Sequence, residues 1–311
     1  TSARDRRTGG GVIEVMIALR SVTAKSALAL IAALALMPQM AAADTRSARI
    51  PMAFSTEAAL PTIAIIIDDM GHDWKQGQRL IDMDQPLTLA FLPFRRYTRQ
   101  LATSAFEKNK EIMLHLPMEN THRLALGRSG ITSDMTREEI VGILRLALAD
   151  IPHVRGMNNH MGSLLTQMKK PMEWVMAELA GQPLYFIDSR TTASTVAAIT
   201  AGEAGVPEMS RDVFLDHENT REYMEQQFRR LIDIARTQGS AIGIGHPHPA
   251  TVNFLAEKLP TLDSEGVAVA TVSAVWSMRH GNQAMFAPSD DSADQRLLAA
   301  KPDEGQADQT N

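Results

Sequence analysis

Acidic and imidazole side chains recur where short apolar runs end along this sequence. Five of the nine histidines lie at such positions, although histidine is a poor helix cap. Helix capping therefore explains some of the aspartates and asparagines but not the histidines. The polar residues at these positions are Asp68, Asp69, His115, Glu119, Asn158, Asn159, His160, Asp188, Ser189, Arg190, Asp216, His217, His246 and His248.

Carboxylate and imidazole groups in this pattern predict a divalent metal site. The chain has no cysteine, which excludes disulfides, thiolate ligands and a cysteine nucleophile. Nitrogen and oxygen ligands without sulfur suit Zn²⁺ or another first-row divalent ion, and zinc is the leading candidate. Asp69, His115 and His160 follow three different apolar runs and are the predicted ligands. Glu119, four residues beyond His115, is the alternative third ligand.

The aspartate doublet Asp68-Asp69 predicts two different chemical roles for neighbouring carboxylates. Side chains of adjacent strand residues point to opposite faces, but a bend at a strand end lets both face one pocket. One of Asp68 and Asp69 can then bind the metal, while its neighbour removes a proton from water activated beside it. The competing interpretation is a helix cap plus a turn residue ahead of Gly71.

The elements that must position these residues are strands alternating with helices. The β-branched run Thr62–Ile67 shows no polar alternation, as expected for a strand buried on both faces of a parallel sheet. The spacing Thr136-x-x-Glu139 indicates a capped helix start. Expected strands are 62–67, 87–91, 111–116, 154–157, 183–187, 211–215, 241–245 and 267–272. Expected helices are 74–83, 98–109, 136–150, 171–180, 194–204, 220–237 and 251–259.

Seven or eight such repeats predict an α/β fold, a closed (β/α)7-8 barrel, with a doubly wound sheet as the alternative. In a parallel barrel all βα loops emerge at the carboxyl ends of the strands, so the polar residues are expected to meet there. The predicted barrel domain spans residues 62–280. A lead-in at 44–61 precedes it, and a polar disordered tail at 281–311 follows.

The N-terminal segment resembles an export signal. Lys25 precedes an apolar run over 27–37, followed by Pro38 and the small residues 41–43. Residues 1–43 are therefore expected to be a signal peptide, with translation starting at Met16 and the mature protein in the periplasm without a transmembrane span. An uncleaved anchor is the alternative. The net charge of −5 argues against a nucleic-acid partner.

Several motifs together resemble the divergent polysaccharide deacetylase family. They are IAIIIDDMGHD (63–73), HLPME (115–119), GMNNHMGS (156–163), YFIDSRTT (185–192), RDVFLD (211–216) and IGHPHP (244–249). The resemblance covers residues 62–275 and implies an irregular barrel that removes acetyl groups from glycans with a divalent metal. It also implies Asp68 as base, Asp69 and His115 as metal ligands, and His246 as acid. Glu119 departs from the superfamily's pattern, which has histidine four residues after the first ligand histidine.

The expected function is metal-dependent hydrolysis of acetyl or related acyl groups on a cell-envelope glycan. Asn158 and Asn159 are expected at the substrate or in the supporting loop, Asp188 and Arg190 beside His246 or the substrate, and His248 in a structural role. One alternative is a non-catalytic module that binds metal or glycan and acts through envelope protein partners. Another is a glycosidase with paired carboxylates such as Asp68 and Asp188.

Overall fold

The computed structural model describes residues 59–281 and 285–286. In this part of the chain, parallel strands alternate with helices. The strands are β1 (Thr62–Met70), β2 (Thr88–Phe91), β3 (Glu111–Met118), β4 (Val154–Met161), β5 (Tyr185–Asp188), β6 (Glu208–Ser210), β7 (Val213–Phe214), β8 (Ser240–Gly245) and β9 (Ala268–Ala270). The helices are α1 (Trp74–Ile81), α2 (Thr98–Glu107), α3 (Arg137–Asp150), α4 (Lys169–Leu179), α5 (Ala197–Glu203), α6 (Arg221–Gln238), α7 (Pro249–Lys258) and α8 (Val272–Arg279).

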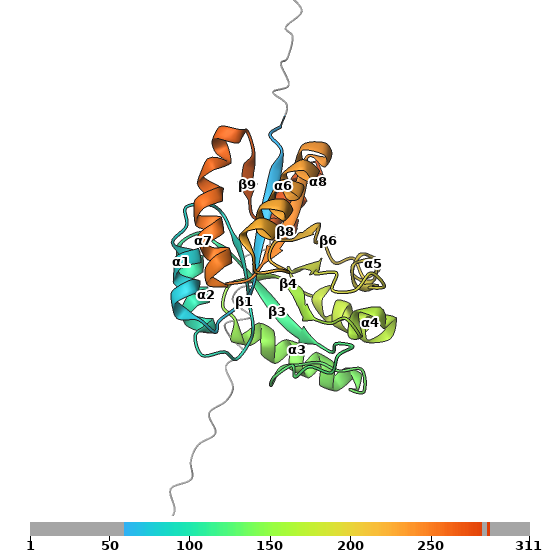
Figure 1. Cartoon of the computed structure of the whole chain (residues 1–311). Helices are drawn as coiled ribbons and strands as arrows, with labels where there is room; N and C mark the ends of the chain where they lie inside the picture. Colours follow the sequence, from blue (N-terminus) through green and yellow to red (C-terminus); the bar gives the residue numbers. More distant parts are fainter. Residues whose placement is uncertain (1–58, 282–284, 287–311) are drawn as a thin grey trace, which may run out of the picture. The chain divides into compact units, whose positions relative to one another are not determined.

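The strands form one parallel sheet that curls into an irregular barrel. Their order is β6-β5-β4-β3-β2-β1-β8-β7, and β9 adds to the start of β1. The two ends of this order, β6 and β7, are separated in the chain only by Arg211 and Asp212. One segment therefore pairs with β5 on one side and with β8 on the other. The strand order never reverses, which confirms the predicted barrel over a doubly wound sheet. Figure 1 shows the helices arranged around the strands.

Side chains of β1 alternate between two apolar cores. Ile63, Ile65 and Ile67 belong to the larger core, which also contains the buried faces of the surrounding helices. Ala64 and Ile66 belong to a smaller core with inward residues of the other strands and of α8. Because both faces are covered, the strand is apolar throughout, as its sequence predicts.

The smaller core marks the inner face of the barrel, and this face leads to the polar residues. Met113 and Ile244 are both in this core. Since strand side chains alternate with a period of two, His115 lies on the same face as Met113, and His246 lies on the same face as Ile244. Asp68 likewise continues the inward series of Ala64 and Ile66. The apolar interior of the barrel thus ends in a polar layer at the carboxyl ends of its strands.

Two expected strands differ from the structure. Within the expected strand 211–215 the structure has only the short strand β7, and β6 precedes it outside the expected range. Between β6 and β7, the Asp212 carboxylate accepts the backbone N–H of Ile242 at 2.8 Å. The expected strand 267–272 is shorter, because Thr271 caps α8, a helix that the sequence pattern did not predict. The predicted capping box at Thr136 and Glu139 is confirmed.

The predicted signal peptide (1–43), most of the lead-in and most of the tail lie outside the described residues. Among the described helices, none combines the length and apolar character needed to cross a membrane.

Candidate metal centre and active site

The aspartate doublet occupies an irregular end of β1. The register with β2 shifts between Ile67 and Met70, and Asp69 has a φ of 55°, in the left-handed region. This bend turns Asp69 away from the face that strict alternation would give it. Asp68 and Asp69 consequently both approach His115, with carboxylate-to-ring distances of 3.6 Å and 3.3 Å.

Asn158 fixes the orientation and tautomer of His115. Its Oδ1 lies 2.6 Å from His115 Nδ1, while its Nδ2 donates to Asp68 Oδ1 at 2.7 Å. Because an amide oxygen only accepts, His115 Nδ1 carries the proton in this pairing. The lone pair of His115 is then on Nε2, which is the arrangement typical of a metal-binding histidine.

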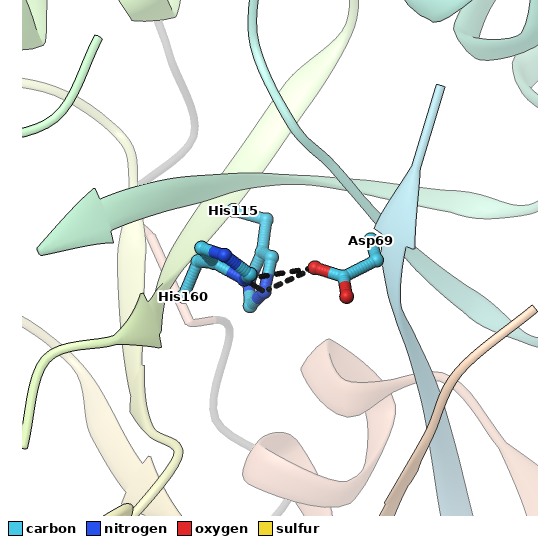
Figure 2. A group of neighbouring side chains, drawn as sticks. All are labelled: Asp69, His115 and His160. Carbon is cyan, nitrogen blue, oxygen red and sulfur yellow. Dashed lines mark hydrogen bonds and ion pairs between the residues drawn. The ribbon is translucent and has the colours of Figure 1, made fainter. Parts of the chain in front are cut away.

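Three ligand-type atoms converge from three strands (Figure 2). His115 Nε2 lies 3.3 Å from Asp69 Oδ1 and 3.1 Å from His160 Nδ1, and His160 Nδ1 lies 2.8 Å from Asp69 Oδ1. Asp69 Oδ1 is buried yet makes no hydrogen bond of proper geometry to any described group. One carboxylate oxygen and two imidazole nitrogens this close to one another form a ligand set that fits a divalent ion.

Electrostatics at this cluster also favour a positive charge. Burial alone raises the pKa of Asp69, but the close contacts and charges of the His115 and His160 rings bring it well below its ordinary value. Burial lowers the pKa of His115, yet the charges of Asp68 and Asp69 raise it above the ordinary value. The pocket therefore stabilises a cation, whether a proton or a metal ion.

Asp68 has a different environment from its neighbour. It is 2 % exposed, and burial raises its pKa despite the nearby His115 and His246. A carboxylate with a raised pKa is suited to accept a proton at neutral pH. The two aspartates thus have opposite pKa shifts within one doublet.

A third histidine, His246, borders the site at the end of the neighbouring strand β8. Ile67 pairs with Gly245, so His246 follows β8 at the level of Asp68. His246 Nδ1 donates to Asp216 Oδ1 at 2.9 Å, and its backbone N–H donates to Asp216 Oδ2 at 2.7 Å. Burial lowers the pKa of His246, but Asp216 outweighs it and raises the pKa to about 9. The raised pKa favours the protonated imidazole at neutral pH, and Nε2 takes no part in the pairing with Asp216.

Other predicted site residues have structural partners instead. Glu119 accepts the backbone N–H of Ser133 at 2.7 Å and is absent from the three-ligand cluster. Asn159 connects Met161 to Ser189 through its amide group. Asp188 accepts the backbone N–H groups of residues 190 and 198 and the hydroxyl of residue 195, so it does not orient His246. Within the described ranges, the side chain of Arg190 makes no hydrogen bond or ion pair.

Asp216 is the residue that orients His246, a role that the sequence pattern did not predict. Its position directly after an apolar run was the available signal, but it also precedes His217 and resembles an ordinary cap. His248 is exposed at the start of α7, and its ring centroid lies 5.7 Å from that of His246. Asp216, His246 and His248 form a second group with metal-ligand atoms in proximity, but Asp216 already binds the His246 ring.

Comparison with known proteins identifies the family to which this chain belongs. The family model described as divergent polysaccharide deacetylase matches residues 65–276. The uncharacterized protein YibQ of Escherichia coli (strain K12) is 37% identical over 211 residues, covering 68% of this chain and 66% of YibQ. An uncharacterized protein of Haemophilus influenzae is 32% identical over 214 residues, covering 69% of this chain and 76% of that protein.

The fold has a solved counterpart in an uncharacterized protein of Agrobacterium tumefaciens C58. That crystal structure matches with a TM-score of 0.68 and 23% identity, over 70% of this chain and 90% of the other. The fold is thus the polysaccharide-deacetylase-like barrel. The chain belongs to the divergent polysaccharide deacetylase family, as the sequence motifs predicted.

Proposed function

We propose that this protein is a metal-dependent hydrolase that removes acetyl or related acyl groups from a glycan. The observation that carries the proposal is the convergence of Asp69, His115 and His160 beside a separate buried carboxylate, Asp68. Asp69, His115 and His160 hold the ion in this proposal, and zinc is the ion that their donor atoms favour. When bound, a divalent ion supplies Lewis acidity, which acidifies water and polarises a carbonyl oxygen.

Asp68 and His246 carry the proton transfers in the proposed reaction. Asp68 accepts a proton from the water that attacks the acyl carbon, and its raised pKa supports this role. His246, held by Asp216, donates a proton to the departing amine or alcohol. Asn158 bonds both Asp68 and His115 and keeps base and ligand in a fixed relation.

The substrate class and cellular place belong to the same proposal. The family resemblance supports a glycan, and the predicted signal at 1–43 supports a cell-envelope glycan reached from the periplasm. The periplasmic location is supported by the predicted signal and not by the site geometry. It is therefore tested separately, by fractionating cells that express the full chain.

The test combines metal analysis with acetate release. Purified protein is loaded with zinc, and acetate is measured from acetylated chitooligosaccharides and peptidoglycan fragments. Asp68→Asn is expected to keep the metal and to lower the rate about 10²- to 10⁴-fold, the usual contribution of a general base. Glu119→Gln, outside the cluster, is the control and is expected to retain both metal and rate.

Three outcomes overturn parts of the proposal. Protein that binds no divalent ion contradicts the metal centre. If the metal-loaded protein releases no acetate and its Asp68→Asn variant keeps its cellular role, the protein is a non-catalytic binding protein. Activity that resists chelators indicates paired-carboxylate glycoside hydrolysis instead.

A further inference from the structure

The loop between β2 and α2 lies directly against the residues that follow the aspartate doublet. The backbone N–H of Leu92 donates to Met70 at 3.0 Å, and that of Tyr97 donates to Gly71 at 3.0 Å. Between them, Arg95 packs on Gly71 so closely that a Cβ at residue 71 would lie 3.3 Å from the Cβ of Arg95. Arg95 is therefore adjacent to the loop that begins two residues after Asp69.

The guanidinium of Arg95 extends to a second loop of the site. A Cβ on Gly127 would lie 2.9 Å from an Nη atom of Arg95. Gly127 belongs to the connection between β3, which carries His115, and α3. The Arg95 side chain thus lies between the loop that follows Asp69 and the loop that follows His115. The pKa of His72 is lowered by burial and then by the charge of Arg95, and Asp69 and His160 also act on that ring.

Arg95 has no partner for its charge among the described residues. Its Nε is buried without a hydrogen bond, and no carboxylate of the described ranges forms an ion pair with it. Its neighbours differ in this respect: Arg99 pairs with Asp150 at 3.1 Å, and Arg96 lies over the Tyr97 ring. A buried donor without a hydrogen bond is costly, and the described residues supply no partner that offsets this cost for Arg95.

The conformation of this loop is also held in place. Phe94 has a φ of 59°, unusual for an aromatic residue, and its N–H donates to the Asp150 carboxylate at 2.6 Å. The Thr98 hydroxyl donates to the Leu92 carbonyl at 2.6 Å. These hydrogen bonds fix the backbone on both sides of Arg95 and so limit the positions that its side chain can reach.

We propose that Arg95 binds an oxyanion, a carboxylate or a phosphate, carried by the glycan beside the acyl group that is removed. Guanidinium matches the planar arrangement of oxygens in these groups and binds them in pairs of hydrogen bonds. The inference rests on the proposed function and narrows its substrate class to anionic glycans. Arg95 acts as a specificity-determining residue and takes no part in proton transfer.

The experiment uses glycans that differ only in charge. The first pair is a peptidoglycan glycan fragment with its lactyl carboxylate free or converted to the methylamide. The second pair is an acetylated chitooligosaccharide with or without a 6-phosphate. For Arg95→Gln, kcat/KM is expected to fall about ten- to hundredfold on the preferred charged member and less than twofold on its neutral partner. Arg95→Lys is expected to recover only part of the loss.

Arg96→Gln is the matched control, since it removes a neighbouring exposed arginine and should leave the discrimination unchanged. Equal losses on charged and neutral glycans overturn the proposal, as does discrimination that survives in Arg95→Gln. Thermal unfolding and metal content of each variant identify a folding defect.

Calorimetric titration separates failure of this inference from failure of the proposed function. The four glycans are titrated into Asp68→Asn and into Asp68→Asn carrying Arg95→Gln. If no acetate is released by the unsubstituted protein, Arg95-dependent preference for a charged glycan still supports the inference. Equal affinity for charged and neutral members, or no binding of either charged glycan, overturns it.

Discussion

The Asp216–His246 pair makes a quantitative prediction about pH dependence. Burial alone lowers the pKa of His246, and Asp216 reverses that effect through a hydrogen bond and its charge. Asp216→Asn keeps the size of the side chain and removes the charge. With burial unchanged, the pKa of His246 is expected to fall from about 9 toward its ordinary value of 6.5 or lower.

The size of the effect follows from these two values. Their difference corresponds to about 3 kcal/mol of preference for the protonated ring, at about 1.4 kcal/mol for each pH unit. A proton donor works only when protonated, so activity is lost as pH rises through the pKa. The alkaline limb should therefore move from near pH 9 to near pH 6.5. At pH 8 the protonated fraction, and with it kcat/KM, should drop about thirtyfold.

The assay is the pH profile of kcat/KM for acetate release between pH 5 and 10, with the same metal loading in each protein. A bound cation shifts both profiles in the same direction, so the difference between them remains informative. Asp212→Asn is the control, because this carboxylate accepts the Ile242 N–H and has no contact with His246. An alkaline limb that stays near pH 9 in Asp216→Asn refutes the assignment of His246 as acid.

Four further results are expected from the geometry. His160→Ala should reduce bound zinc below a tenth of the wild-type content while Glu119→Ala retains it, and equal retention in both contradicts the cluster. A chelator should abolish acetate release and lower the Tm, with both restored by zinc, because an ion that binds only the folded state stabilises it. Gly156→Ala places a Cβ 2.3 Å from the Tyr185 ring and should destabilise by about 1–3 kcal/mol in urea unfolding. Gly142→Ala, with open space in α3, should instead stabilise by about 0.5–1 kcal/mol.

The barrel was predictable because its strands are apolar on both faces and its helices carry clear start signals. Ile63 to Ile67 are all fully buried, which is what an uninterrupted β-branched run predicts. The break between β6 and β7 at Asp212 was not predictable, since it involves a side chain that accepts a backbone N–H thirty residues away. Local propensity contains no information about such a long-range contact.

Most of the site follows from the period of two along each strand. His115 shares a face with the interior residue Met113, and His246 shares one with Ile244. Asp188 instead shares a face with Phe186, which packs in the outer core, and this explains why its carboxylate is used in the loop beside α5. The face of each strand, together with its end, therefore distinguishes Asp188 from the inward-facing histidines.

Asp69 is the exception to this rule. By alternation it belongs with Ile63, Ile65 and Ile67 on the outer face, where a carboxylate would be buried among apolar side chains. The left-handed φ of 55° moves it into the cluster instead, and aspartate tolerates that conformation better than most residues. Two adjacent carboxylates can then have opposite pKa shifts, because one ends a regular strand and the other turns away from it toward two histidines. The site therefore depends on the backbone conformation at Asp69 as much as on the two carboxylates. A substitution that prevents the left-handed turn should abolish metal binding even if it keeps a carboxylate at this position.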